Sequence, residues 1–206
     1  MHDMTRPHDL LWGMTPAQLP ADAPDWARQV VDAGQPVVVR RAVVSSDQIA
    51  VGLRGTSRNQ RYAAVMPASA VLRRVRPEQL VEQLPAAELP ALCALAQLKP
   101  AFDALGLCWG VTGSVGYQLA TGLPTAHADS DLDLLLRVPT ALSRTDAREL
   151  QLQLDAAPCR VDLQLETPAG AVALREWAGS SARVLLKSAA GACLVENPWD
   201  QAENVA

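Results

Sequence analysis

The spacing of hydrophobic residues predicts a small β-rich region in the first half of the chain. Short runs rich in β-branched and other apolar residues predict strands over 36–43, 49–55 and 61–66, because such runs suit a pleated, half-buried surface. Helical spacing is confined to residues 26–32 and 77–84, and the second of these begins with a proline in its first turn. The first half is therefore expected to be mainly sheet.

The second half alternates between helical and strand-like spacing. Apolar residues recur every three or four positions over 89–105, which predicts an amphipathic helix. After it we expect helices over 115–121, 144–156 and 170–177, and strands over 107–111, 131–136, 160–166, 184–188 and 193–195. The last two strands flank Gly191 and predict a hairpin. This mixture indicates an α+β fold with a mixed sheet.

A proline-bracketed segment, Pro85–Pro90, is the expected domain boundary. The 206 residues suffice for one large domain or two small ones. We therefore expect a small, β-rich, arginine-rich N-terminal domain over 1–88, and a second domain over 89–206 in which helices flank a mixed sheet.

Composition excludes several classes of protein. Apolar residues make up 49% of the chain, which is enough for a buried core and too much for a disordered protein. No apolar run approaches the roughly 18 residues of a membrane span, and the first residues do not resemble a signal peptide. The four cysteines form no C-x-x-C pair. We therefore expect reduced thiols in a cytoplasmic protein with no membrane partner.

Charge is distributed unevenly. The net charge of −4 argues against a nucleic-acid partner, yet eight arginines and a single acidic residue, Asp47, lie between positions 40 and 76. This block is either a solvated surface or a site for a polyanion or an acidic partner protein. Within it, Arg54, Arg58 and Arg61 lie near glycines and a polar turn, which suits phosphate contact.

Two acidic residues, Asp131 and Asp133, open a predicted strand. Side chains two residues apart on a strand share a face, so their carboxylates should stand side by side and repel unless a cation separates them. Mg²⁺ is the natural candidate, since it prefers oxygen ligands and is held by one or two carboxylates plus substrate phosphates. Asp162, on another predicted strand, would complete a trio if the two strands are neighbours. An Asp-x-Asp triplet at a strand start is, by itself, more often a turn former.

A glycine and a serine, Gly113 and Ser114, separate an apolar run from a predicted helix. The free N–H groups at a helix N-terminus and the positive end of the helix dipole suit phosphate. A serine at this position can equally be a simple N-cap. The pair gains weight from its place in the order strand, Gly-Ser, helix, Asp-x-Asp strand, helix, Asp strand.

This order resembles the nucleotidyltransferase superfamily built on the polymerase-β palm. The resemblance implies that the Gly-Ser turn grips a triphosphate, that the three aspartates hold two Mg²⁺ ions, and that an acceptor hydroxyl attacks the α-phosphorus. One departure is the sixteen-residue gap between Ser114 and Asp131, which is longer than the commonest gap in that superfamily.

The segments Gly113–Leu123 (GSVGYQLATGL) and Ser130–Leu134 (SDLDL) resemble one branch of that superfamily, the phosphoribosyl-dephospho-CoA transferases of malonate decarboxylase, also called holo-acyl-carrier-protein synthases. The resemblance extends to residues 36–41, 51–55, 160–162, 176–177, 184–187 and 198–199. It therefore covers most of the chain from about residue 36.

The resemblance implies a specific reaction. The donor is 2′-(5-triphosphoribosyl)-3′-dephospho-CoA, and a serine of the apo acyl-carrier subunit of malonate decarboxylase attacks its α-phosphorus, so that pyrophosphate leaves. Asp131 and Asp133 would bind Mg²⁺, and Asp162 would bind a second ion, accept the serine proton, or both. Gly113 and Ser114 would hold the β- and γ-phosphates.

Basic residues are the other candidates for substrate contact, and two alternative functions stay open. Arg54, Arg58, Arg61 and Lys187 are the expected phosphate ligands, while the arginine block could also dock an acidic carrier. One alternative is another Mg²⁺-dependent nucleotidyltransferase that transfers AMP from ATP to a hydroxyl. The other is a non-catalytic module that binds acyl-carrier proteins. The sequence also does not separate malonate decarboxylase from citrate lyase as the host system, since both use the same prosthetic group.

Overall fold

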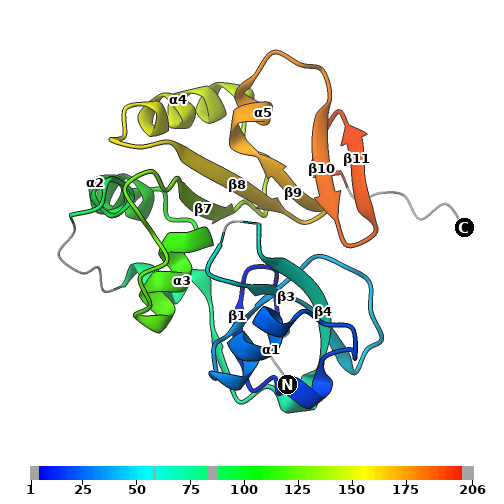
Figure 1. Ribbon diagram of the computed structural model, residues 1–206. Coiled ribbons are helices and arrows are strands. Elements are labelled where there is room, and N and C mark those ends of the chain that lie inside the picture. The colour runs from blue at the N-terminus through cyan, green and yellow to red at the C-terminus, as the bar shows by residue number, and fades with distance from the viewer. Residues whose placement is uncertain (1–4, 58, 83–87, 201–206) are drawn as a thin grey trace, which may run out of the picture. The chain divides into compact units, whose positions relative to one another are not determined.

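The computed structural model describes residues 5–57, 59–82 and 88–200 (Figure 1). The chain divides into two compact units, Met1–Arg76 and Pro77–Ala206. The division falls twelve residues before the boundary expected after residue 88. Packing explains the earlier division, because a Cβ at Gly110 would overlap the backbone of Pro77 and Glu78 and because Val81 belongs to the second core.

The first unit is built on an antiparallel sheet in the order β4-β3-β2-β1-β5. Its strands are β1 (Leu10–Trp12), β2 (Val37–Val39), β3 (Gln48–Arg54), β4 (Arg61–Pro67) and β5 (Arg73–Val75). Its helices are α1 (Asp25–Asp32) and the short 3₁₀ segments η1 (Pro16–Gln18) and η2 (Ala68–Ala70). The helix over 26–32 and the strands over 49–55 and 61–66 are confirmed, and the two strands pair as a hairpin. The strand expected over 36–43 is shorter.

Alternation along β3 separates the two faces of this sheet. Val51 and Leu53 are buried in a core with residues of β2, β4 and α1. Gly52 and Arg54 point to the other face, as the period of two requires. Since Arg54 stands directly opposite Arg61 in the ladder, this outer face carries two neighbouring guanidinium groups.

The second unit is built on a mixed sheet in the order β11-β10-β9-β8-β7-β6. Its strands are β6 (Trp109–Val111), β7 (Leu132–Arg137), β8 (Val161–Thr167), β9 (Gly170–Ala173), β10 (Val184–Ser188) and β11 (Gly191–Val195). Its helices are α2 (Pro90–Ala104), α3 (Gly113–Thr121), α4 (Arg144–Asp155), α5 (Leu174–Ala178) and the 3₁₀ segment η3 (Pro77–Val81). Among the described strands, only β7 and β8 pair in parallel, and α4 is the crossover between them (Figure 1).

Two sequence predictions for this unit are corrected. Residues 77–84, expected to be an α-helix, form the shorter 3₁₀ segment η3, and residues 83–84 lie outside the described part of the chain. Residues 170–177, expected to be helical, form β9 followed by the short helix α5. Pairing of Val172 with Leu165 on β8 overrides the helical preference of the alanines around it.

One face of the mixed sheet is packed into the larger core. Leu132, Leu134 and Leu136 of β7 are fully buried there with residues of β8, α2 and α4. The alternate residues of β7 and β8 therefore point to the opposite face, which carries most of the charged side chains of these strands. No helix in the described part of the chain combines the length and hydropathy that a membrane crossing requires.

Candidate active site

The two central strands of the mixed sheet bring Asp133 and Asp162 together. Asp133 of β7 is in register with Asp162 of β8, so the two residues face the same side of the sheet on backbones about 4.8 Å apart. Both side chains are partly exposed. The adjacency of these strands, on which the sequence prediction of a carboxylate trio depended, is confirmed.

Asp131 and Arg160 stand one residue before the first paired positions of β7 and β8. The backbone N–H of Leu132 donates to the carbonyl of Arg160 at 2.9 Å, which fixes the two strand entrances side by side. On the same strand, the Arg160 guanidinium reaches Asp162, with Nε and Nη2 each 3.1 Å from Oδ1. The end of the sheet at which β7 and β8 begin therefore carries the carboxylates of Asp131, Asp133 and Asp162 and the guanidinium of Arg160. We call this end of the sheet the carboxylate edge.

The Gly113 turn lies directly against the Asp133 carboxylate. Gly113 has φ +62°, and a Cβ at this position would overlap the Asp133 side chain, so both the left-handed backbone and the close approach require glycine. Thr112, the residue before it, donates its N–H to the Asp133 carbonyl at 2.8 Å. These contacts set the N-terminus of α3, which begins at Gly113, beside the carboxylate edge.

The loop between α3 and β7 is held to α3 by several hydrogen bonds. The Thr125 hydroxyl donates to the carbonyl of Ser114 at 2.9 Å, and the Gln118 side-chain oxygen accepts from the N–H groups of Thr125 and Ala126. The extended gap before Asp131 is therefore an ordered connection that returns the chain to the turn. Ser114 itself is buried, with 8% of its surface exposed.

The negative charge of the three carboxylates affects the pKa of Arg160. Its hydrogen bond to Asp162, followed by the attraction of Asp162, Asp131 and Asp133, raises the pKa of the guanidinium above its ordinary value. All three carboxylates therefore act on this one cation. The reverse also holds, because Arg160 offsets part of their mutual repulsion.

The donor set suits a divalent cation, but the carboxylates do not stand as a ready-made site. Three carboxylates on one sheet edge, one of them seated against a glycine turn, are oxygen ligands of the kind that Mg²⁺ takes. Within the described residues, however, no three acidic, histidine or cysteine side chains are close enough to hold a metal ion as they stand. Asp162 would have to exchange Arg160 for the ion.

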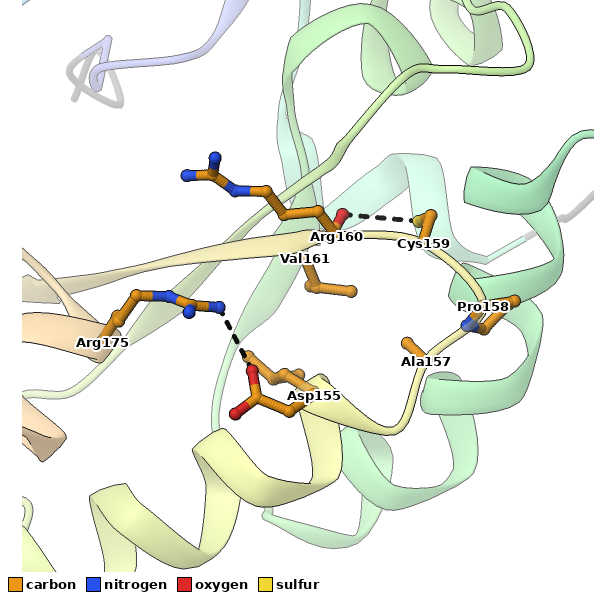
Figure 2. A pocket seen from close by; sticks show the side chains of 8 residues that line it. Asp155, Ala157, Pro158, Cys159, Arg160, Val161 and Arg175 are labelled. Atoms are coloured by element: carbon orange, nitrogen blue, oxygen red, sulfur yellow. Dashed lines mark hydrogen bonds and ion pairs between the residues drawn. The ribbon is translucent and has the colours of Figure 1, made fainter.

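An open hollow of about 680 Å³ lies beside β8, next to the carboxylate edge (Figure 2). It is lined by the C-terminal end of α4, the loop 157–160, Val161 and Arg175. Figure 2 shows the Val161 side chain on the same side of the strand as Asp155 and Arg175, whereas the Arg160 guanidinium lies on the other side. None of the three aspartates lines this hollow, so it is separate from the candidate site.

The remaining residues predicted from the sequence do not join the carboxylates within the second unit. Lys187 is exposed and pairs with Ala171, in the cross-strand row of Glu166, which is four residues and about 13 Å along β8 from Asp162. Arg54 and Arg61 belong to the first unit, and Arg58 lies outside the described residues. Their phosphate-binding roles stay predictions.

Comparison with known proteins identifies the family. Residues 6–77 match the phosphoribosyl-dephospho-CoA transferase MdcG N-terminal domain, and residues 79–198 match the C-terminal domain of the same family. This chain belongs to the phosphoribosyl-dephospho-CoA transferase family. The boundary between the two matched domains agrees with the division of the structure at Arg76.

Proteins of this name are similar to the chain over nearly its whole length. The phosphoribosyl-dephospho-CoA transferase of Pseudomonas fluorescens strain Pf-5 is 60% identical over 97% of this chain and 96% of the relative. That of Pseudomonas putida strain W619 is 60% identical over 96% and 97% of the two chains, and that of Azotobacter vinelandii strain DJ is 56% identical over 97% and 98%. No solved structure shows significant similarity to the chain.

Sequence reasoning missed Arg160 as a member of the site. The segment Arg160–Asp162 was part of the family resemblance, but no role was assigned to its arginine. A signal was present, because residues two apart on a strand share a face and Arg160 is therefore placed beside Asp162. The preference of this guanidinium for Asp162 became evident only in the structure.

Proposed function

We propose that this protein transfers the 2′-(5-phosphoribosyl)-3′-dephospho-CoA group from its triphosphate precursor to a serine of the apo acyl-carrier subunit of malonate decarboxylase. Family membership over both domains supports the donor class. The observation that carries the proposal is the in-register pair Asp133 and Asp162, with the Gly113 turn seated against Asp133. A turn for phosphates and carboxylates for a cation are the two parts that phosphoryl-type transfer needs.

Asp131, Asp133 and Asp162 are the residues that would hold Mg²⁺. When bound there, the ion would offset the negative charge that develops on the leaving pyrophosphate. This dependence on a divalent cation is part of the proposal, as is the assignment of the fold to the nucleotidyltransferases.

The chain's own groups would orient the reactants and move one proton. Backbone N–H groups at Gly113 and Ser114 would bind the β- and γ-phosphates at the start of α3. The serine oxygen forms a bond to the α-phosphorus while the bond from that phosphorus to the pyrophosphate oxygen breaks. Asp162 is the candidate acceptor for the hydroxyl proton, because a serine hydroxyl is a poor nucleophile at neutral pH.

The first unit is proposed to bind anionic parts of the substrates. Arg54 and Arg61 face each other across β3 and β4 at the end of the hairpin, which concentrates positive charge on the outer face. Arg58, which lies outside the described residues, and Lys187 in the second unit are further candidate phosphate ligands. An acidic carrier protein and a polyanionic donor both suit such a surface. Nucleic acid and membranes are not proposed as partners, and a cytoplasmic location stays the expectation.

The test combines the protein with the triphosphoribosyl donor, Mg²⁺ and each apo-carrier. Mass spectrometry of the malonate decarboxylase carrier should show the added prosthetic group, and pyrophosphate should appear in equal amount. Parallel reactions would use ATP as the donor or the citrate lyase carrier as the acceptor. Modification from ATP alone would identify a different nucleotidyltransferase, and carrier binding with no modification from either donor would indicate a docking module.

A further inference from the structure

The Arg160 guanidinium forms an ion pair with Asp162, one of the three carboxylates at the start of β7 and β8. Its Nε and Nη2 lie 3.1 Å from one oxygen of Asp162, and its backbone carbonyl accepts from Leu132, next to Asp131. The side chain is 62% exposed, while that of Asp162 is 40% exposed. The backbone of Arg160 is thus fixed beside Asp131, while its side chain is largely exposed to solvent.

The ion pair between Arg160 and Asp162 is expected to contribute little to the stability of the fold. Exposed pairs contribute little to folding because water and salt screen them and because ordering two side chains costs entropy. The role of this pair is better explained by the site, because Asp131, Asp133 and Asp162 bring negative charges close together at the start of β7 and β8. A positive group beside Asp162 stands in for part of the charge that a divalent cation would bring.

We propose that Arg160 is an exchangeable counter-ion: it pairs with Asp162 while no metal is bound, and it turns to the donor's phosphates when a divalent cation takes its place. This inference rests on the proposed function. The contact of the Arg160 guanidinium with Asp162 supports it, because Asp162 is one of the three carboxylates that would hold the ion. A planar guanidinium suits both partners, since its donors match carboxylate and phosphate oxygens alike.

The proposal predicts opposite effects of one substitution on two ligands. In Arg160→Gln, Mn²⁺ alone should bind about three- to fivefold more tightly than to the wild type, because an exposed competing cation is gone. Pyrophosphate in the presence of saturating Mn²⁺ should bind about tenfold more weakly, because a charged hydrogen-bond donor is lost. Electron paramagnetic resonance of free Mn²⁺ and titration calorimetry measure the two affinities without turnover.

A similar ion pair nearby provides the matched control. Arg175 lies 3.2 Å from Asp155 and is 59% exposed, but both residues lie on the α4 side of β8 (Figure 2). Arg175→Gln should leave both affinities unchanged. Arg160→Lys keeps the charge without the planar fork, so Mn²⁺ affinity should return to near the wild-type value and pyrophosphate affinity should recover only in part.

The outcomes separate this inference from the proposed function. If the wild type binds Mn²⁺ and Arg160→Gln binds it no more tightly, the exchange is wrong while the metal site stands. Weaker binding of both ligands by a folded Arg160→Gln would likewise overturn the exchange and indicate a purely structural pair. A wild type that binds no divalent cation would overturn the metal site and the exchange together, whereas unmodified carriers alongside the expected affinities would overturn only the proposed reaction.

Discussion

Each unit of the molecule places two like charges directly opposite one another on neighbouring strands. In the second unit the pair is Asp133 and Asp162, and in the first it is Arg54 and Arg61. Directly opposed like charges destabilise a sheet by a few tenths to about 1 kcal/mol. Under the proposed function, each pair serves binding at some expense of stability.

The surroundings of the two pairs differ, and the difference shows what each suits. Asp133 lies against the Gly113 turn and Asp162 pairs with a guanidinium, so the two carboxylates stand side by side between a glycine turn and a cation. The arginines lie on an outer sheet face whose neighbouring positions, Gly52 and Ala63, are small. Neighbouring carboxylates suit a small cation, whereas neighbouring guanidinium groups suit an anion.

The largest expected effect is on the carboxylate pair. Asp133→Asn keeps the shape of the side chain against Gly113 but removes its charge, so carrier modification should fall by about a thousandfold or more. The free energy of unfolding should stay the same or rise by about 0.5 kcal/mol, since repulsion from Asp162 is relieved. Single-turnover assays and urea denaturation measure the two quantities. Asp155→Asn, on α4, is the control and should leave the rate of carrier modification nearly unchanged. A stable Asp133→Asn variant with full activity would contradict the proposed site.

The turn that supports this pair gives the next effect. Gly113→Ala should lower the free energy of unfolding by about 3 kcal/mol, because a left-handed backbone costs about 1–2 kcal/mol and overlap with Asp133 adds to it. Gly122→Ala is the control, since Gly122 has φ +75° but open space around its Cβ position, and it should cost only the backbone term. Equal losses from the two substitutions, measured by urea denaturation, would show that Asp133 does not crowd the turn.

The Gly113 turn and the carboxylates beside it also show which features of the site could be predicted from the sequence. Gly-Ser before a helix and Asp-x-Asp at a strand start were visible as spacing, because long elements that bury one face repeat their apolar residues regularly. The contact of Gly113 with Asp133 was not visible, since it depends on how β6, α3 and β7 meet. From the sequence, the pairing of β7 with β8 was only the condition on which the carboxylate trio depended, and the register that opposes Asp133 to Asp162 came from the structure.

The short strands and the choice of ion-pair partners were beyond the sequence. β1 and β5 have three residues each and are defined by their pairing, as in Trp12 with Arg73, so no periodicity could develop within them. Asp9, fully buried beside Arg74, likewise carries no sequence signal of its burial. Such features arise from tertiary contacts, which outweigh local preference.

A smaller effect is expected at the arginine pair. Arg61→Gln should raise the KM for the donor by about tenfold with a lesser change in kcat, because a charged contact to a substrate anion is removed while the reacting atoms are untouched. Arg28→Gln is the control: Arg28 donates to the carbonyls of Pro20 and Ala21, so its loss should lower the unfolding temperature and leave KM unchanged. An unchanged donor KM in Arg61→Gln would remove this residue from the binding surface.

The smallest expected effect is on the reactivity of the Cys159 thiol, which depends on the negative charge of Asp131 and can be measured without any substrate. Burial first, and then the negative charge of Asp131, raise the pKa of the Cys159 thiol, while a hydrogen bond from the Leu132 backbone partly opposes them. Because the thiolate is the reactive form, a raised pKa leaves less of it at a given pH. Alkylation of Cys159 at pH 8 should therefore be slower than that of the exposed Cys193.

Replacing Asp131 should shift this reactivity in a defined direction. In Asp131→Asn the pKa of Cys159 should fall, so its alkylation rate at pH 8 should rise by about twofold and the pH midpoint should move down. Cys193 should be unaffected and serves as the internal control in peptide mass spectrometry of the same sample. An unchanged midpoint at Cys159 would mean that the charge of Asp131 is directed away from the entrance of β8, and Asp131 would then be a poorer ligand than the in-register pair.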